Sequence, residues 1–222
     1  MTATATDYKT LIESLPSGTV TILPDVDWED YEELLEDLVE ASHLRLTYDN
    51  GRLQIMSVSP EHEGISTLFS PLIFVLAEEL ELDYLSRGST TFKQPSERKA
   101  TEPDDCYYFD NFKRISGKKR IDLRVDPPPD LVIEVDITHV SLNKFSIYAT
   151  IGVPELWVHD GDEIRFYILN LDDYVESSSS QLFPFLTPQT VLSFLKKGEE
   201  EGATVMGREF RKWVRAQKEK TQ

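Results

Sequence analysis

The stretch Pro129-Asp130-Leu131-Val132-Ile133-Glu134-Val135-Asp136 decides how the rest of this chain is interpreted. Its short apolar run predicts a buried β-strand. Side chains alternate along a strand, so the carboxylates of Asp130, Glu134 and Asp136 share one face. Three acids on one side of an apolar strand are costly to bury unless something binds them. A divalent metal ion is the simplest explanation, and Lys144 just downstream suggests chemistry on an anionic substrate.

A second acidic motif, Glu102-Pro103-Asp104-Asp105, lies upstream and places Asp104 30 residues before Glu134. This separation fits two neighbouring strands joined by an excursion of the chain, which would bring the two carboxylates together. Hard cations such as Mg²⁺ take oxygen ligands and usually keep several waters, so two or three carboxylates suffice. We therefore expect Asp104 and Glu134 to hold Mg²⁺ or Mn²⁺, with Asp130 or Asp136 as a further ligand.

Lys144 is the first lysine or arginine after the acidic strand. A bound metal ion would polarise a phosphoryl oxygen and lower the pKa of a bound water. Lys144 would then steady the attacking water or the developing charge on the phosphate. Spacing alone leaves an alternative open, in which the acids solvate the ends of the strand and Lys144 is a surface charge.

The net charge of −17 argues against tight binding of nucleic acid, because phosphate contacts dominate such binding. The charge is unevenly distributed, however. Residues 25–40 carry nine acids and no Lys or Arg, whereas residues 87–124 carry ten basic residues against six acids. The basic stretch brackets Asp104, and its segment 112–120 either holds a phosphate backbone or forms a solvated loop. An anionic substrate is therefore not excluded.

Length and composition predict one α/β domain. A chain of 222 residues with 40% hydrophobic content can bury a large core. We expect an irregular N-terminal arm over residues 1–24 and a single domain over residues 25–222, which includes a basic C-terminal helix. No apolar run is long enough for a transmembrane span, and the N-terminus lacks the pattern of a signal peptide. No membrane association is therefore expected.

The chain has one cysteine, Cys106, which cannot form an internal disulfide. Such a residue is more often a small hydrophobic side chain in the core than a nucleophile. A reducing cytoplasm is the expected compartment.

Local patterns predict the order of the elements. Asp27 and Ser59 are expected to cap helices that run to about Glu40 and Leu82. Asp49-Asn50-Gly51-Arg52 predicts a tight hairpin turn between two strands. The remaining expectations are strands over residues 84–93 and 104–109, a helix over residues 142–151, and a hairpin about Asp160-Gly161.

The segment from about Trp28 to Trp213 resembles the bacterial domain-of-unknown-function family described as putative restriction endonucleases, a branch of the PD-(D/E)XK nuclease superfamily. The resemblance implies a restriction-endonuclease-like mixed β-sheet flanked by helices. It also implies that Asp104 matches the motif aspartate and Glu134 the motif acid. The phrases that carry the resemblance are Tyr48–Leu53, Ser59–Glu63, Gly88–Lys93, Glu102–Tyr108, Pro127–Val135 and Gly152–Trp157.

One position departs from the superfamily pattern. The lysine of the superfamily follows the motif acid by two residues, and Asp136 stands there in this chain. The lysine role can move to a following helix, for which Lys144 is the candidate. Asp136 would then join the metal ligands, because it shares the face of Glu134.

His62 lies in the first turn of a helix that such folds place beside the site. It would contact a metal-bound water or the substrate, or else form a structural bond to a neighbouring loop. The expected function is therefore a metal-dependent endonuclease acting on DNA, with Asp104, Glu134, Lys144 and His62 as its catalytic residues. A homodimer would supply the two sites needed to cut both strands. The alternative is a catalytically inactive nuclease fold that works as a binding or regulatory protein.

Overall fold

The computed structural model describes residues 12, 15–38, 41, 43–137 and 142–221. Most of the predicted arm therefore lies outside the described residues, but its residues Val20–Leu23 form a strand, β1. Two β-sheets organise the rest of the chain. The first is antiparallel, and its strands in spatial order are β1 (Val20–Leu23), β3 (Arg52–Ser57), β2 (Leu44–Asp49), β6 (Lys99–Thr101) and β5 (Phe92–Gln94).

The second sheet is mixed. Its strands β8 and β9 run parallel, and all its other neighbours are antiparallel. Parallel neighbours need a crossover connection, which the chain makes through helix α5 between them. In spatial order the strands are β11 (Asp173–Ser177), β10 (Ile164–Asn170), β9 (Glu155–His159), β8 (Leu131–Val135), β7 (Asp105–Tyr108) and β4 (Leu85–Ser86).

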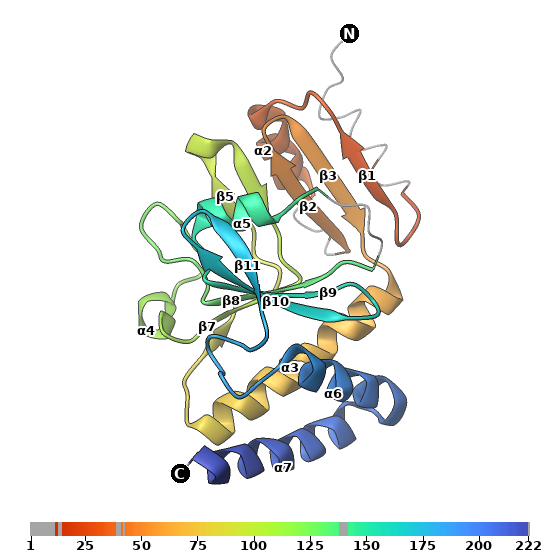
Figure 1. The fold of residues 1–222 in the computed structure, drawn as a ribbon. Helices are drawn as coiled ribbons and strands as arrows, with labels where there is room; N and C mark the ends of the chain where they lie inside the picture. The colour runs from red at the N-terminus through yellow and green to blue at the C-terminus, as the bar shows by residue number, and fades with distance from the viewer. Residues whose placement is uncertain (1–11, 13–14, 39–40, 42, 138–141, 222) are drawn as a thin grey trace.

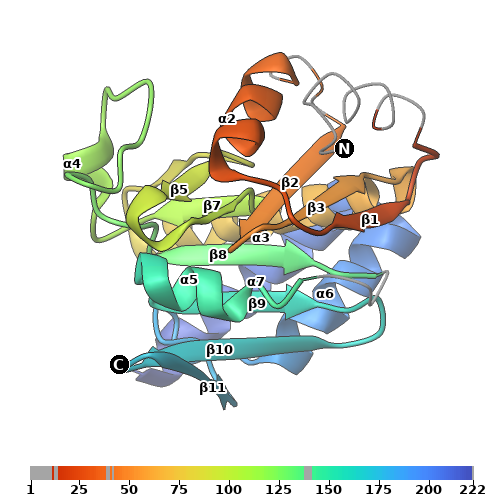
Figure 2. The same cartoon turned by 90° about the horizontal axis from the view of Figure 1, so that it is seen from above.

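Helices cover both faces of the mixed sheet. Helices α3, α6 and α7 lie on one face, and α5 lies on the other with the antiparallel sheet (Figures 1 and 2). The expected mixed sheet flanked by helices is confirmed, and the antiparallel sheet is a second layer that the sequence did not predict. The helices are α2 (Trp28–Asp37), α3 (Pro60–Leu80), α4 (Phe112–Ile115), α5 (Phe145–Ile151), α6 (Pro188–Glu201) and α7 (Ala203–Thr221), with a 3₁₀ turn at Pro95–Glu97.

Two local predictions are confirmed near the site. Strands β2 and β3 form the expected hairpin, with Asn50 and Gly51 at φ of 48° and 88° as a tight turn of this kind requires. Ser59 caps α3 by accepting a hydrogen bond of 3.1 Å from the His62 amide. This cap fixes the first turn of α3, which carries His62. Asp27 precedes α2 without making a side-chain cap.

The prediction of one strand over residues 84–93 is wrong. Residues 85–86 pair with β7 in the mixed sheet, whereas residues 92–94 pair with β6 in the antiparallel sheet. Between them Gly88 adopts a positive φ of 53°, which glycine tolerates at little cost. The chain uses this segment to cross from one sheet to the other.

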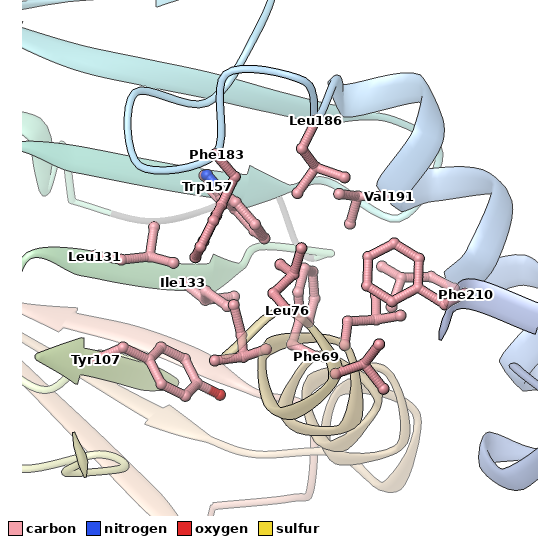
Figure 3. Close-up of a cluster of buried hydrophobic side chains, with 14 of the residues drawn as sticks. Phe69, Leu76, Tyr107, Leu131, Ile133, Trp157, Phe183, Leu186, Val191 and Phe210 are labelled. Atoms are coloured by element: carbon pink, nitrogen blue, oxygen red, sulfur yellow. The ribbon is translucent and has the colours of Figure 1, made fainter. Parts of the chain in front are cut away.

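The largest core cluster lies between the mixed sheet and helices α3, α6 and α7. Figure 3 shows Phe69 of α3 packed near Ile133 and Trp157 of the sheet. Trp157 also stacks on Phe166, with ring centroids 4.5 Å apart. Because side chains alternate along β8, the burial of Ile133 on this face turns Glu134 toward the opposite face, where α5 lies.

Among the described residues, none of the helices is both long and apolar enough to cross a membrane.

The packing of α6 against α3 and α7 generates a prediction about two glycines. A Cβ at Gly198 of α6 would lie 2.7 Å from Met206 Sδ and 3.1 Å from a methyl group of Leu68, and Met206 is fully buried. Gly198→Ala should therefore destabilise the protein by about 1–3 kcal/mol through overpacking.

The matched control is Gly207→Ala in α7, where a Cβ meets nothing within 4 Å. That substitution should stabilise the protein by about 0.5–1 kcal/mol through helix propensity. Urea unfolding of both variants measures the difference, and equal effects would contradict the packing described for Gly198.

Candidate active site

Asp104 and Glu134 lie on neighbouring segments of the mixed sheet, in the arrangement that their spacing predicted. Strands β7 and β8 pair antiparallel with Asp105 opposite Ile133, so Asp104 lies beside the end of β8. The Val135 amide donates a 2.7 Å hydrogen bond to Asp104 Oδ2. The aspartate side chain thus replaces a backbone acceptor where the strand pairing ends.

Glu134 faces α5, and two side chains of that helix hold it. Lys144 Nζ lies 2.7 Å from Glu134 Oε2, and the Tyr148 hydroxyl donates to Glu134 Oε1. Lys144 stands at the N-cap position of α5, so Tyr148 follows it by one turn on the same side of the helix. All three side chains are largely buried. We call this arrangement the Glu134 clamp.

Tyr148 did not emerge from the sequence analysis. The signal that could have found it is its spacing of four residues from Lys144 in a predicted helix, because residues so spaced face the same neighbour. The sequence does not show that this helix packs close enough to β8 for the Tyr148 hydroxyl to reach Glu134.

His62 reaches the site from the first turn of α3. Its Nε2 lies 3.2 Å from Asp104 Oδ2, and both side chains are almost fully buried. This contact is an ion pair without hydrogen-bond geometry, since neither ring nitrogen of His62 has a hydrogen-bond partner among the described residues. The structure therefore brings together His62, Asp104, Glu134 and Lys144.

The His62–Asp104 pair favours its charged form. Burial opposes protonation of His62, but the Asp104 carboxylate, the Val135 backbone and the charge of Glu134 outweigh it and raise the pKa of His62. Burial likewise disfavours the Asp104 carboxylate, yet His62 and Lys144 hold its pKa below the usual value. Asp104 is therefore kept ionised.

In the Glu134–Lys144 pair, the pKa of the carboxyl group shifts in the opposite direction to that of Asp104. Burial raises the pKa of Glu134, and repulsion from Asp104 adds to this, while Lys144 acts in the opposite sense. Burial also disfavours the charge on Lys144, but the carboxylates of Glu134 and Asp104 raise the pKa of the lysine above its usual value. The lysine stays protonated, and Glu134 depends on it to remain charged.

Asp130 lies outside this cluster. Its carboxylate accepts hydrogen bonds from the Phe109 amide at 2.7 Å, the Asn111 amide at 3.2 Å and Asn111 Nδ2 at 2.8 Å. Both oxygens are thus used to hold the turn after β7, which explains its burial without a metal ion. Asp130, one of the two residues expected as a further ligand, is therefore engaged by this turn instead of by the carboxylate cluster.

A cavity of about 340 Å³ opens beside the Glu134 clamp, and Asp136 lines it next to Glu134 and Lys144. The Asp136 amide donates to the His159 carbonyl at 2.8 Å, which anchors the chain after β8. The other lining residues are Gln54, Met56, Val135, Leu142, Asn143, Phe145, Tyr148, Leu156 and Val158.

The donor set of this site suits a hard divalent cation. Asp104 Oδ1 is buried and has no hydrogen-bond partner among the described residues. Each oxygen of Glu134 accepts one bond in the clamp and keeps a second lone pair. Within the described part of the chain, no three His, Cys, Asp or Glu side chains group closely enough to form a complete protein cage. Mg²⁺, which keeps several waters, needs no such cage.

The buried ion pair of the clamp generates a stability prediction. Lys144→Met should lower the free energy of unfolding by about 3–5 kcal/mol, because the buried Glu134 carboxyl must then either stay charged without its cation or take up a proton. In a Glu134→Gln background the same substitution should cost much less. Urea unfolding of the two single variants and the double variant measures this coupling.

Lys197→Met is the control for this prediction, since Lys197 pairs with Glu201 at 2.6 Å on the exposed face of α6. We expect little change there, because exposed pairs contribute little. Equal losses at Lys144 and Lys197, or additive effects of the Glu134 and Lys144 substitutions, would contradict the clamp.

Comparisons with known proteins identify a family for this chain. No curated protein sequence matches the chain. Among solved structures, the chain is similar to one titled as a putative nuclease belonging to DUF820 from Anabaena variabilis ATCC 29413. The two are 16% identical, the match covers 68% of this chain and 90% of that chain, and the TM-score is 0.48. The sequence model of the family described as "Putative restriction endonuclease" matches residues 28–195, well over half of the chain. The chain therefore belongs to the putative restriction endonuclease family, as its motifs predicted.

Proposed function

We propose that this protein is a metal-dependent endonuclease that hydrolyses phosphodiester bonds of DNA. The observation that carries the proposal is the pairing of Asp104, whose buried Oδ1 has no hydrogen-bond partner among the described residues, with Glu134 in its clamp. Burying two carboxylates side by side is costly, and the cations from α3 and α5 outweigh burial at Asp104 but leave the pKa of Glu134 raised. Membership of the restriction endonuclease family supports nucleic acid as the substrate class.

In this proposal Asp104 and Glu134 hold Mg²⁺ or Mn²⁺, and Asp136 contributes from the cavity wall. The ion, when bound, supplies Lewis-acid activation of the phosphoryl group and of water. His62 keeps Asp104 ionised through its positive charge. Tyr148 fixes the orientation of Glu134 by donating to Oε1, which leaves Oε2 to Lys144.

Lys144 takes the place of the lysine that the superfamily carries two residues after the motif acid. Support comes from its position, because the N-terminus of α5 lies over β8 and brings Nζ within 2.7 Å of Glu134 Oε2. From there the ammonium group can stabilise negative charge that develops on the phosphate. Asp136 occupies the position where the superfamily carries the lysine. Its negative charge raises the pKa of Lys144 and so favours the protonated lysine.

Two further features belong to this proposal. A homodimer would present two such sites to the two strands of a duplex. A cytoplasmic location suits the single cysteine, Cys106, which is buried in the core beside Val132 and Leu156. Burial also raises the pKa of its thiol far above the usual range, which disfavours the reactive thiolate.

Cleavage of supercoiled plasmid in Mg²⁺ or Mn²⁺ tests the activity. We expect wild-type protein to nick or linearise the plasmid, and Asp104→Asn and Glu134→Gln to reduce the rate at least about 100-fold, because each removes a charge from the metal site. EDTA should abolish cleavage by the wild type.

The control for cleavage is Asp130→Asn, which neutralises a buried carboxylate next to the same strand but outside the cluster. It should retain activity, provided that thermal melting shows it to be folded. Equal cleavage by all four proteins would expose a contaminating nuclease. An inert wild type would favour the alternative function, a nuclease fold that binds without cutting.

Calorimetry with Mn²⁺ in the absence of DNA tests the metal site independently of activity. We expect Asp104→Asn to weaken Mn²⁺ binding at least about tenfold, since the amide loses the charge while its oxygen can still accept from the Val135 amide. Asp136→Asn should weaken binding less, and Asp130→Asn not at all. Unchanged affinity in Asp104→Asn would remove Asp104 from the ligand set.

A further inference from the structure

A second cavity, of about 550 Å³, is lined by Glu102, two residues before Asp104, and has more basic than acidic side chains in its wall. Four basic and two acidic side chains line it. The basic ones are Arg45, Lys93, Lys119 and Arg120, and the acidic ones are Glu36 and Glu102. In a chain of net charge −17 this local excess of positive charge is unusual. We call this cavity the basic groove, and the segments that line it (α2, β2, β5 and the loop after α4) can be followed in Figure 2.

The basic groove forms because β2 is longer than its neighbour β6. Strand β6 pairs only with residues 47–49 of β2, so residues 44–46 are left beside open space. There the Leu46 amide donates to Glu102 Oε2 at 2.9 Å, and the Thr91 hydroxyl donates to Glu102 Oε1 at 2.7 Å. Both oxygens of this acid are thus engaged by the protein. The charge of Glu102 interacts with these donors and with Arg45, and the four basic against two acidic side chains still leave the lining an excess of positive charge.

The loop that supplies Lys119 and Arg120 is held in place. Arg87 Nη2 donates to the carbonyl oxygens of Ile115 at 3.0 Å and Lys118 at 2.8 Å. The Lys118 side chain pairs with Asp126 at the far end of the loop. Lys119 and Arg120 themselves are exposed, and neither has an ion-pair partner within the described residues. Their charges are available to a ligand.

Several residues that line the basic groove lie close to elements of the carboxylate cluster. Arg45 in the groove pairs across the hairpin with Met56, which lines the cavity of the Glu134 clamp. Paired residues on adjacent strands project from the same face of a sheet, so Arg45 and Met56 lie on one face of the antiparallel sheet. Arg45 also lies 3.4 Å from Glu63, the residue after His62 in α3. Glu102 in turn lies near enough to Lys144 for the lysine to lower the pKa that burial raises.

We propose that the basic groove binds the phosphate backbone of nucleic acid and leads one strand to the carboxylate cluster. Lys119 and Arg120 contact phosphates directly, and the hydroxyl-bearing residues Ser89 and Thr90 offer further donors. Such contacts carry no base specificity, so the groove binds sequence non-specifically. This inference rests on the proposed function for its substrate class, but it assigns a separate surface and can be tested without catalysis.

The test is fluorescence anisotropy with a labelled DNA oligonucleotide, single-stranded and as a duplex, in EDTA so that no cleavage occurs. The double variant Lys119→Ala/Arg120→Ala should bind at least about tenfold more weakly than the wild type. The slope of log K against log salt should fall by about two, one for each phosphate contact removed.

The matched control is Lys113→Ala/Arg114→Ala, which removes the same charge from the same basic segment. These residues are exposed on α4 and do not line the groove. We expect less than a twofold change in affinity and an unchanged salt slope. All four substituted residues are exposed, so the variants should fold, and thermal melting checks this.

The outcomes separate the groove from the proposed function. Equal weakening by the two double variants, or no weakening by Lys119→Ala/Arg120→Ala, overturns the groove even if the plasmid is cleaved. Loss of binding confined to Lys119→Ala/Arg120→Ala supports the groove even if the wild type cuts nothing. A wild type that binds no oligonucleotide at low salt overturns the groove and leaves the cleavage assay to judge the function.

Discussion

The contact between Glu134 and Lys144 is the interaction on which the arrangement of the site depends. A carboxylate in the middle of a buried strand is stable only where a cation and hydrogen-bond donors reach it. Helix α5 supplies both, through Lys144 and Tyr148, and this fixes where the helix lies over β8. The crossover from β8 to β9 therefore serves two purposes. It allows two parallel strands to pair, and it delivers the lysine that the strand itself lacks.

The need of buried polar groups for hydrogen-bond partners also explains how the two sheets are joined. The chain passes from β6 to β7 through Glu102, Pro103 and Asp104, and each acid in this turn completes an interrupted strand pairing. Glu102 accepts from the Leu46 amide in the antiparallel sheet, and Asp104 accepts from the Val135 amide in the mixed sheet. The motif thus joins the sheets while leaving Asp104 Oδ1 directed to no protein donor among the described residues. Structural and candidate catalytic roles coexist in one turn.

Charge is segregated across the molecule. Acids accumulate on α2, where Glu29 and Asp30 in the first turn suit the helix dipole. Lys144 is buried against a carboxylate of the site. Lys119 and Arg120 are exposed on a loop that Arg87 holds through two hydrogen bonds. A net charge of −17 consequently says little about what the groove binds, because screening confines each charge to its neighbourhood of about 10 Å.

Local features of this protein follow directly from its amino-acid sequence. Residues 49–52 predict a hairpin turn and Ser59 predicts a helix cap, because both signals depend on residues close together in the chain. The two acidic motifs predict that Asp104 and Glu134 lie on neighbouring segments of a sheet. Features that depend on distances between elements emerge only once the chain is folded. The tertiary structure assigned Asp130 to the turn after β7, divided residues 84–93 between two sheets, and set Tyr148 against Glu134. Packing of the core against one face of β8 turned Glu134 to the other face. No local sequence pattern predicts that α5 is the helix that covers this second face.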